Sequence, residues 1–302
     1  MANIIDVVGL RKMLGDKEAV SDVSFSIGTD QIFGFIGPNG AGKTTTIRMI
    51  LGLLKPDRGI ISILGRTADE NRKDINRKIG FMLHDPGLSE ELSCYENLYY
   101  YADIYGVEKK RIEHLLKEVD LWESRSVNVG NFSRGMKQKV VLARALLHDP
   151  TILILDEPAT GLDPEMQVWM RTYLQGLAKN GKTILISSHN LFEVQQICSH
   201  IGIIYKGKMI KSGSVEDLQK ETSRITIELE IDDPARMKGY DISRYVDLWT
   251  MEGKKITATL SREEDISALV KYLSDCDFRI SDMNRKKMSV EDLYIKCVEG
   301  AR

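Results

Sequence analysis

The sequence predicts an α/β fold with a parallel β-sheet at its centre. Two short apolar runs without polar alternation, Ile152–Leu155 and Thr183–Ser187, are typical of strands in a parallel sheet that is covered on both faces. A third β-rich run, Gln31–Ile36, leads into a glycine-rich loop, and helical spacing begins after it, from Lys43 to about Leu53. A strand, a glycine loop and a helix in succession open an α/β unit.

The other elements expected in this region flank the glycine loop. Short β-rich segments are expected at Ile4–Lys12, Ala19–Ile27, Ile60–Leu64 and Lys78–Leu83. From Leu88 to His148 charged residues are interleaved with Leu, Val and Tyr in a helical pattern, which predicts a helical subdomain inserted over about residues 86–150. A further helix is expected at Glu165–Asn180, between the two apolar strands.

The C-terminal part of the chain follows a different pattern. The stretch Gly213–Glu221 is flanked by glycine and rich in charge, which indicates a domain boundary. Beyond it we expect strands at Arg224–Ile231, Lys255–Leu260 and Phe278–Met283, and helices at Glu263–Ser274 and Val290–Val298. The sequence therefore predicts a large domain over residues 1–220 and a small α+β domain over residues 221–302.

The composition excludes several classes of protein. Of 302 residues, 42 are Lys or Arg and 44 are Asp or Glu, which gives a formal net charge of −2. This near-balance argues against a nucleic-acid-binding protein held mainly by phosphate attraction, because such domains carry a basic excess. Hydrophobic residues make up 42% of the chain, enough for a large core, so disorder of the whole chain is excluded.

The cysteines and the apolar runs exclude others. The four cysteines, Cys94, Cys198, Cys276 and Cys297, lie far apart and form no CxxC pair. We expect reduced thiols of a cytosolic protein, not a disulfide framework or a zinc site. No apolar run approaches the roughly 18 residues of a membrane-spanning helix. The first residues show no basic region followed by an apolar segment, so no secretory signal is expected.

The glycine-rich loop fits a phosphate-binding pattern. Residues Gly37–Thr44 match GxxxxGK[ST]. In this pattern glycines let successive backbone N–H groups point at phosphate oxygens, the lysine supplies a cation for the β and γ phosphates, and the hydroxyl binds Mg²⁺. Lys43 and Thr44 would take these two roles. The alternative is a plain glycine turn before a helix, but the strand before the loop and the helix after it favour a phosphate loop.

Ionisable residues follow the next two apolar strands. Asp156, at the carboxyl end of a parallel strand, is placed to hold Mg²⁺ through water, and Glu157 to polarise an attacking water. His189 closes the other strand, where an imidazole could reach a γ-phosphate oxygen. Alone, these would be an ordinary acidic turn and a structural histidine. The phosphate loop in the same chain favours the catalytic interpretation.

A further motif identifies a family. Residues Phe132–Lys139 have the sequence FSRGMKQK, which resembles the LSGGQ signature of the ATP-binding cassette (ABC) family and stands shortly before the two carboxylates. Other phosphate-loop ATPases lack this element, although alone it could be a helix N-terminus capped by Ser133. Ala159–Pro164 is similar to the D-loop of the family, and His189 to its switch histidine. Residues 1–220 thus resemble the nucleotide-binding subunit of an ABC transporter, and Met288–Tyr294 resembles the closing segment of the C-terminal extension in many exporter-type cassettes.

The resemblance implies a P-loop NTPase fold with a RecA-like parallel core, an antiparallel β subdomain and the inserted helical subdomain. It also implies a composite site, with ATP between the phosphate loop of one cassette and the signature of a second. Contacts to phosphate and magnesium in cis would come from Asn39, Gly40, Ala41, Gly42, Lys43, Thr44 and Thr45. Ser133 and Gly135 would contact the γ-phosphate in trans, and Asp163 would link the two halves. Glu157 would be the general base and His189 the γ-phosphate sensor.

Three positions depart from the family pattern. Leu14 stands where an aromatic residue usually stacks on adenine, which predicts a weaker hold on the base. His84 replaces the glutamine of the Q-loop, where an imidazole can still bind water or the metal. Arg134 replaces a signature glycine and adds a charge beside the anion site.

A group of tyrosines opens the helical block: Tyr95, Tyr99, Tyr100, Tyr101 and Tyr105. Their spacing suits core or surface positions of a helix. The family resemblance offers a second interpretation, a groove near the Q-loop that receives a cytoplasmic helix of the permease.

The sequence therefore predicts the ATPase subunit of an ABC exporter, with ATP and Mg²⁺ as ligands. The expected partners are a second cassette subunit, in a homodimer or heterodimer, and a separate integral membrane permease, but no nucleic acid. The protein would be cytoplasmic, on the inner face of the cell membrane through its permease. One alternative is a soluble ABC ATPase of DNA repair or ribosomes, which would carry coiled-coil insertions or two cassettes. Another is a nucleotide-responsive binding module with little hydrolysis, motivated by Leu14 and His84.

Overall fold

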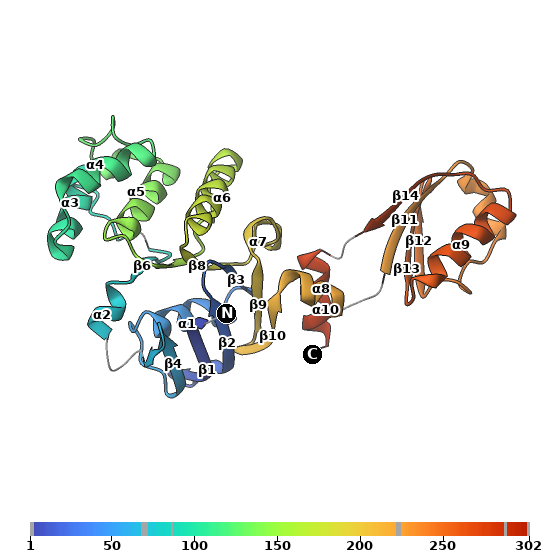
Figure 1. Cartoon of the computed structure of the whole chain (residues 1–302), viewed down its shortest axis with the longest axis horizontal. Coiled ribbons are helices and arrows are strands. Elements are labelled where there is room, and N and C mark those ends of the chain that lie inside the picture. The colour runs from blue at the N-terminus through green and yellow to red at the C-terminus, as the bar shows by residue number, and fades with distance from the viewer. Residues whose placement is uncertain (1–2, 68–71, 86, 222–224, 287–288, 301–302) are drawn as a thin grey trace. The chain divides into compact units, whose positions relative to one another are not determined.

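The computed structural model of the chain describes residues 3–67, 72–85, 87–221, 225–286 and 289–300. Its contacts divide the chain into two compact units, Glu216–Lys296 being one and Met1–Val215 with Cys297–Arg302 the other (Figure 1). The division falls inside the stretch where the composition indicates a boundary. In the described part of the chain, no helix is both long and apolar enough to cross a membrane.

A 10-stranded sheet organises the first unit, in the order β5-β4-β1-β2-β10-β9-β3-β8-β7-β6. Its parallel strands are β3 (Ile32–Ile36), β6 (Ile79–Met82), β7 (Ile152–Asp156), β8 (Thr183–Ser188) and β9 (His200–Tyr205). Every residue of β3, β7 and β8 is buried, as expected of a parallel sheet covered on both faces. The predicted parallel core is confirmed.

The rest of this sheet is largely antiparallel and consists of β1 (Asn3–Leu14), β2 (Lys17–Gly28), β4 (Arg58–Ile63), β5 (Arg66–Thr67) and β10 (Lys208–Ser214). Phe25 of β2 stacks on Phe33 and Phe35 of β3, with ring centroids 5.1 and 5.4 Å apart. One hydrophobic core therefore joins the antiparallel β subdomain to the parallel strands.

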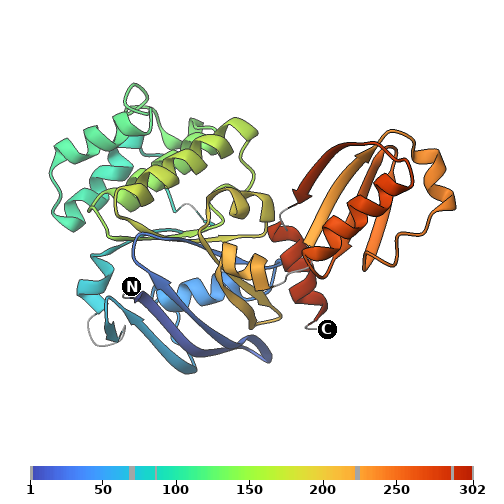
Figure 2. The ribbon, with the colours of Figure 1, turned by 45° about the vertical axis from the view of Figure 1, so that its right-hand side comes forward.

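The helices of the first unit are α1 (Lys43–Ile50), α2 (Arg72–Asn76), α3 (Cys94–Tyr105), α4 (Lys109–Glu118), α5 (Arg134–Leu146), α6 (Pro164–Lys179) and α7 (Leu191–Ile197), with a 3-10 turn at Val129–Asn131. Three of them, α3 to α5, lie between β6 and β7, within the range predicted for the helical insertion. Ser93 starts α3 with a capping box, because its hydroxyl accepts the N–H of Glu96 while the Glu96 carboxylate accepts the N–H of Ser93. Figure 2 shows this insertion and the β1–β2–β4 strands on opposite sides of the parallel strands.

The second unit is built on a 4-stranded antiparallel sheet in the order β12-β13-β11-β14. Its elements are β11 (Ile225–Ile231), a 3-10 turn (Pro234–Gly239), β12 (Leu248–Glu252), β13 (Lys255–Leu260), α9 (Glu264–Asp275) and β14 (Ile280–Lys286), together with most of α8 (Val215–Glu221) and of α10 (Val290–Glu299). Leu269 and Leu273 of α9 are fully buried in one cluster with Leu229 and Ile256 of the sheet. The predicted small α+β fold is confirmed.

Four elements of the structure, α7, β9, β10 and β12, were not predicted from the sequence pattern. The edge strand β12 alternates exposed and half-buried residues, so its apolar pattern is weak. The helix α7 has only one fully buried residue, Val194, and its start depends on the Asn190 cap. Short elements of this kind carry too few apolar positions to show a period.

Candidate active site

Polar residues gather at one edge of the parallel sheet, where β3, β7 and β8 end. Asp156, the last residue of β7, pairs with Ser187 of β8, and β3 lies on the other side of β8. The glycine loop after β3, Glu157 after β7 and His189 after β8 therefore emerge side by side. Because ligands of open α/β sheets bind at the carboxyl ends of the strands, this edge is the candidate site.

The loop after β3 has a backbone that only small residues can follow. Gly40 and Gly42 have φ angles of +77° and +108°, which glycine adopts without strain. A Cβ on Gly37 would lie 2.3 Å from a backbone oxygen of β9, so this position also excludes a side chain. Asn39 and Gly40 are exposed at the tip of the loop, and Ala41 is buried.

Helix α1 begins directly after the loop. Gly42 is its N-cap, no side chain caps it, and its first turn holds no acidic residue. Its first N–H groups and the positive end of its dipole are thus available at the loop, and Thr44 and Thr45 lie half-buried in this turn. This arrangement suits an anion such as phosphate.

Lys43 is held inside the site by the loop. Its side chain is only 5% exposed, and Nζ donates hydrogen bonds to the carbonyl oxygens of Gly37 at 2.7 Å and Pro38 at 3.2 Å. Nζ also lies 3.6 Å from Oε1 of Glu157. Burial lowers the pKa of Lys43, although the charge and hydrogen bond of Glu157 act to raise it. The structure thus keeps a partly desolvated cation at the base of the loop.

Asp156 joins the loop to β8. Its Oδ2 accepts a hydrogen bond from Thr44 Oγ1 at 2.8 Å, and its Oδ1 accepts one from Ser187 Oγ. Among the described residues, no group of three or more His, Cys, Asp or Glu side chains could hold a metal ion. One carboxylate with a hydroxyl fits Mg²⁺, which usually keeps several waters and binds one or two carboxylates together with substrate phosphates.

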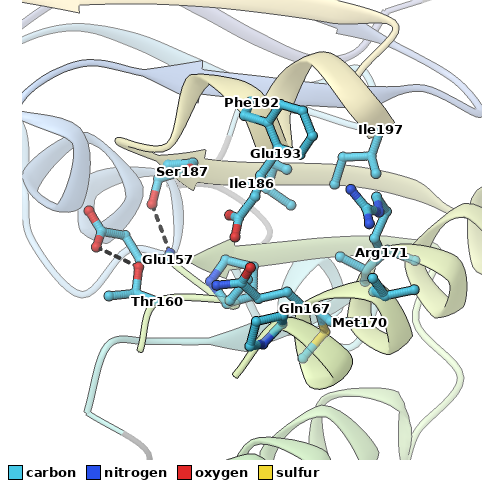
Figure 3. Close-up of a pocket in the computed structure, with 16 residues that line it drawn as sticks. Glu157, Thr160, Gln167, Met170, Arg171, Ile186, Ser187, Phe192, Glu193 and Ile197 are labelled. Atoms are coloured by element: carbon cyan, nitrogen blue, oxygen red, sulfur yellow. Dashed lines mark hydrogen bonds between the residues drawn. The ribbon is translucent and has the colours of Figure 1, made fainter. Parts of the chain in front are cut away.

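Glu157 has an unusual backbone at the centre of the site. Its φ angle is +53°, a conformation that costs a non-glycine residue about 1–3 kcal/mol. Its N–H donates to Oγ of Ser187 at 3.0 Å. Its Oε2 accepts a hydrogen bond from Thr160 Oγ1 at 3.1 Å (Figure 3). The same oxygen lies 3.1 Å from Nδ1 of His189. The strained turn therefore aims the carboxylate at Lys43 and His189.

The surroundings keep Glu157 ionised. Burial acts to raise the pKa of Glu157, but the hydrogen bond and charge of His189, with the charge of Lys43 and the Thr160 hydroxyl, outweigh it. The pKa of Glu157 therefore lies below its ordinary value, and the group can accept a proton at neutral pH. His189 is 43% exposed, so its ring borders both Glu157 and solvent.

The predicted signature and D-loop residues sit at two helix starts. Ser133 caps α5 by accepting the N–H of Met136 at 3.3 Å, and Asp163 caps α6 by accepting the N–H of Met166 at 2.9 Å. Gly135 is buried against α6. In the described part of the chain, no hydrogen bond or ion pair joins these three residues to the glycine loop.

Two predicted ligands stand apart from the polar cluster. Leu14 ends β1 at a hairpin turn and is 48% exposed. The other strand of that hairpin touches the loop, since a Cβ on Gly42 would lie 2.6 Å from the carbonyl oxygen of Ala19. His84 is exposed after β6, and no hydrogen bond or ion pair within the described residues connects it to Thr44 or Asp156.

Sequence reasoning missed two hydroxyls of the site. Ser187 holds both Asp156 and the backbone of Glu157, and Thr160 holds the Glu157 carboxylate. Their only signal was position, at the end of an apolar strand and inside the D-loop. A cavity of about 190 Å³ lies beside Glu157, between α6 and α7, and no sequence pattern indicated it. Figure 3 shows residues that line this cavity.

Comparison with known proteins decides the family. Residues 20–160 match the ABC transporter family. A bacitracin transport ATP-binding protein of Bacillus licheniformis is 38% identical over 307 residues, which cover 99% of this chain and 99% of that protein. The chain belongs to the ABC transporter family. A Nod factor export ATP-binding protein I of Burkholderia lata is 34% identical over 272 residues, which cover 88% of this ABC protein and 89% of the Burkholderia protein.

A solved structure supports the same assignment for the fold. An ATP-binding subunit of an ABC transporter superposes on this ABC protein with a TM-score of 0.67 and 32% identity, over 72% of this chain and 93% of the other. The protein is thus an ABC cassette, the ATP-binding subunit of a transporter and an ATPase. The P-loop fold that the motifs predict is confirmed.

Proposed function

We propose that this cassette hydrolyses ATP with Mg²⁺ to drive an exporter whose permease is a separate chain. The observation that carries the proposal is the position of the Glu157 carboxylate between two basic groups, Lys43 Nζ at 3.6 Å and His189 Nδ1 at 3.1 Å. A base, a phosphate-binding cation and a sensor at one sheet edge are the groups that phosphoryl transfer to water requires.

Each residue then has a defined task. The loop N–H groups and Lys43 bind the β and γ phosphates at the start of α1. Thr44 and Asp156 would hold Mg²⁺, which supplies charge neutralisation on the phosphates. Glu157 accepts a proton from the attacking water, and His189 orients the carboxylate while it contacts the γ-phosphate.

A second cassette would complete the site. Ser133 and Gly135 stand at the start of α5, and none of the hydrogen bonds of the described chain ties them to their own glycine loop. Two cassettes packed head to tail would bring each signature to the partner's nucleotide. ATP binding would close this dimer, and hydrolysis would open it.

The permease would bind near His84. A cavity of about 200 Å³ adjoins the segment after β6 and is lined by Phe81, Leu83, Tyr101, Tyr105, Arg144 and His148, among others. On the same helix α3, Tyr100 is 62% exposed. An aromatic pocket of this kind suits a helix of a membrane subunit, which would hold the cassette at the inner face of the cell membrane. The relatives named for bacitracin transport and Nod factor export favour export.

Substitution of Glu157 by Gln tests the proposal. The variant keeps the shape of the side chain but loses the base, so we expect ATP binding to persist while hydrolysis falls by about 10²-fold or more. With ATP and Mg²⁺ the variant should accumulate as a closed dimer in size-exclusion chromatography. Glu113→Gln, at an exposed ion pair of α4, is the matched control and should keep wild-type turnover. Unchanged phosphate release in Glu157→Gln would overturn the assignment of the base.

A further inference from the structure

Arg134, the residue that departs from the signature pattern, has no electrostatic reason for its place. It is the first residue of α5, directly after the Ser133 cap. The positive end of the helix dipole lies there, so a cation is unfavourable at this position. No hydrogen bond or ion pair ties its exposed guanidinium to any other residue of the described chain. Within the described chain, the guanidinium of Arg134 therefore makes packing contacts only.

The packing partner is Gly161 of the D-loop. A Cβ built on Gly161 would lie 2.4 Å from Nη1 of Arg134, 2.5 Å from Cζ and 2.9 Å from Nη2. All three atoms of the guanidinium end thus face the Gly161 backbone. Gly161 also has a φ of +72°, which favours glycine at this position, and the guanidinium end of Arg134 occupies the space where a side chain of residue 161 would lie.

A second contact joins the same two segments. A Cβ on Gly135 would lie 2.9 Å from Cγ of Met166 in the first turn of α6, and the N–H of Met166 is bound by Asp163. The start of α5 therefore touches the segment Ala159–Met166 at two successive residues. The first contact is the guanidinium on Gly161.

This contact lies close to the catalytic base. Gly161 directly follows Thr160, whose hydroxyl donates to Oε2 of Glu157 at 3.1 Å (Figure 3). One packing contact, one peptide unit and one hydrogen bond thus connect Arg134 to the carboxylate of Glu157. A shift of Gly161 would move Thr160 and change the direction of this hydrogen bond.

We propose that Arg134 is a positioning residue that couples the signature segment to Glu157 through Gly161 and Thr160. The inference rests on the proposed function, in which the signature contacts the nucleotide of the partner cassette while Glu157 acts on the cassette's own nucleotide. Within one chain, the guanidinium would then link the movement of the signature segment to the movement of Glu157. Nucleotide binding in one composite site would adjust the base of the other.

A double-mutant cycle tests this coupling on the full-length protein. Arg134→Gly releases the D-loop, so we expect kcat for ATP to fall roughly threefold to tenfold, the effect of coupled neighbours, with KM for ATP nearly unchanged. The Hill coefficient for ATP should fall toward one. Gly161→Ala displaces the guanidinium of Arg134 from the D-loop, so it should lower kcat in the wild-type background and lower it less in the Arg134→Gly background. Additive effects in this cycle would overturn the proposal.

Two control variants separate the contact from other causes. Gly106→Ala introduces the same kind of backbone strain, at φ +69°, with no atom within 4 Å of the new Cβ, so its effect should be additive with Arg134→Gly. Arg134→Met keeps the reach of the side chain without its charge and should restore most of kcat. A methionine variant as slow as the glycine variant, with a raised KM, would overturn the packing role in favour of a direct phosphate contact.

The experiments can disprove the coupling through Arg134 without disproving the proposed function. Thermal unfolding of the same four proteins measures the Arg134–Gly161 contact without catalysis, and an additive cycle there would also overturn the contact. If Glu157→Gln forms the ATP-dependent dimer while Arg134→Gly keeps wild-type kcat and cooperativity, only the coupling is wrong. If Glu157→Gln forms no dimer, the proposed head-to-tail site is wrong, and the proposed coupling between sites is then wrong as well.

Discussion

The two units of the chain differ in what they bury. The core of the first unit contains polar and charged side chains, including Lys43, Asp156 and Ser187, and the last residue of one buried strand is a carboxylate. In the described part of the second unit every fully buried side chain is apolar, as in the cluster around Leu229 and Leu269. Buried polar groups cost free energy unless they are paired, and in the first unit hydrogen bonds pair Lys43 with loop carbonyls and Asp156 with Thr44 and Ser187.

This difference shows where the chemistry lies. The buried polar groups of the first unit converge on one sheet edge, where Glu157 also adopts a left-handed backbone. Strain and buried charge at one place are typical of a functional site. The second unit has an apolar α+β core, and its described residues form no comparable cluster of buried polar side chains.

The largest expected effect concerns the second unit. Leu229→Ala removes a fully buried side chain from its sheet and should lower the free energy of unfolding of that unit by about 2–5 kcal/mol. Chemical denaturation with a probe in each unit would measure it, while ATP hydrolysis should stay at the wild-type rate. Leu248→Ala, at a side chain that is 64% exposed on β12, is the control and should change stability little. Loss of ATPase activity in Leu229→Ala would show that the units are not separate in function.

Lys43→Ala, in contrast, should lower the affinity for nucleotide and leave the stability of the protein nearly unchanged. It removes a charge-assisted contact to phosphate worth about 1.5–3 kcal/mol, so nucleotide affinity should fall roughly 10- to 100-fold. Because burial already lowers the pKa of Lys43, its charged form is less favourable in the folded protein than in the unfolded chain. Thermal unfolding should therefore change little, and calorimetry with ATP would show the loss. An unfolded variant would contradict the view that Lys43 serves the ligand.

His189→Ala should shift the pH dependence of hydrolysis. His189 lowers the pKa of Glu157, and only the ionised carboxylate can act as base, so wild-type activity should persist as pH falls until that lowered pKa is reached. Without His189 the pKa of Glu157 rises, and the acid limb of kcat moves to higher pH. A pH series of steady-state rates would measure the shift. His114→Ala, at an exposed histidine of α4, should leave the limb where it is.

Leu14→Tyr should give the smallest effect and the only gain. An aromatic ring at the end of β1 could stack on adenine, a contact worth about 0.5–1.5 kcal/mol, which lowers the Kd for ATP roughly 2- to 10-fold. The affinity for inorganic triphosphate should not change. Equal tightening for both ligands would mean that residue 14 does not contact the base.

The residues of the polar cluster at the sheet edge could be predicted from the sequence because their signals are local. The glycine pattern, the carboxylates after β7 and the histidine after β8 each occupy a few successive residues, and parallel strands bring such strand ends to one edge. Elements without a local signal, such as α7 and β12, could not be predicted. The roles of Ser187 and Thr160 depend on hydrogen bonds between side chains that only the folded chain brings together.

The sequence by itself determined the fold class, the phosphate loop and the family, since periodicity and motif spacing depend on neighbouring residues. Only the tertiary structure decided how the parts meet: the left-handed turn that directs Glu157 between Lys43 and His189, and the guanidinium of Arg134 on Gly161. The physical reason is that burial, strain and side-chain contacts depend on residues far apart in the chain. In the sequence Arg134 is a departure from the signature pattern, and in the folded protein its guanidinium lies against Gly161, next to the threonine that holds Glu157.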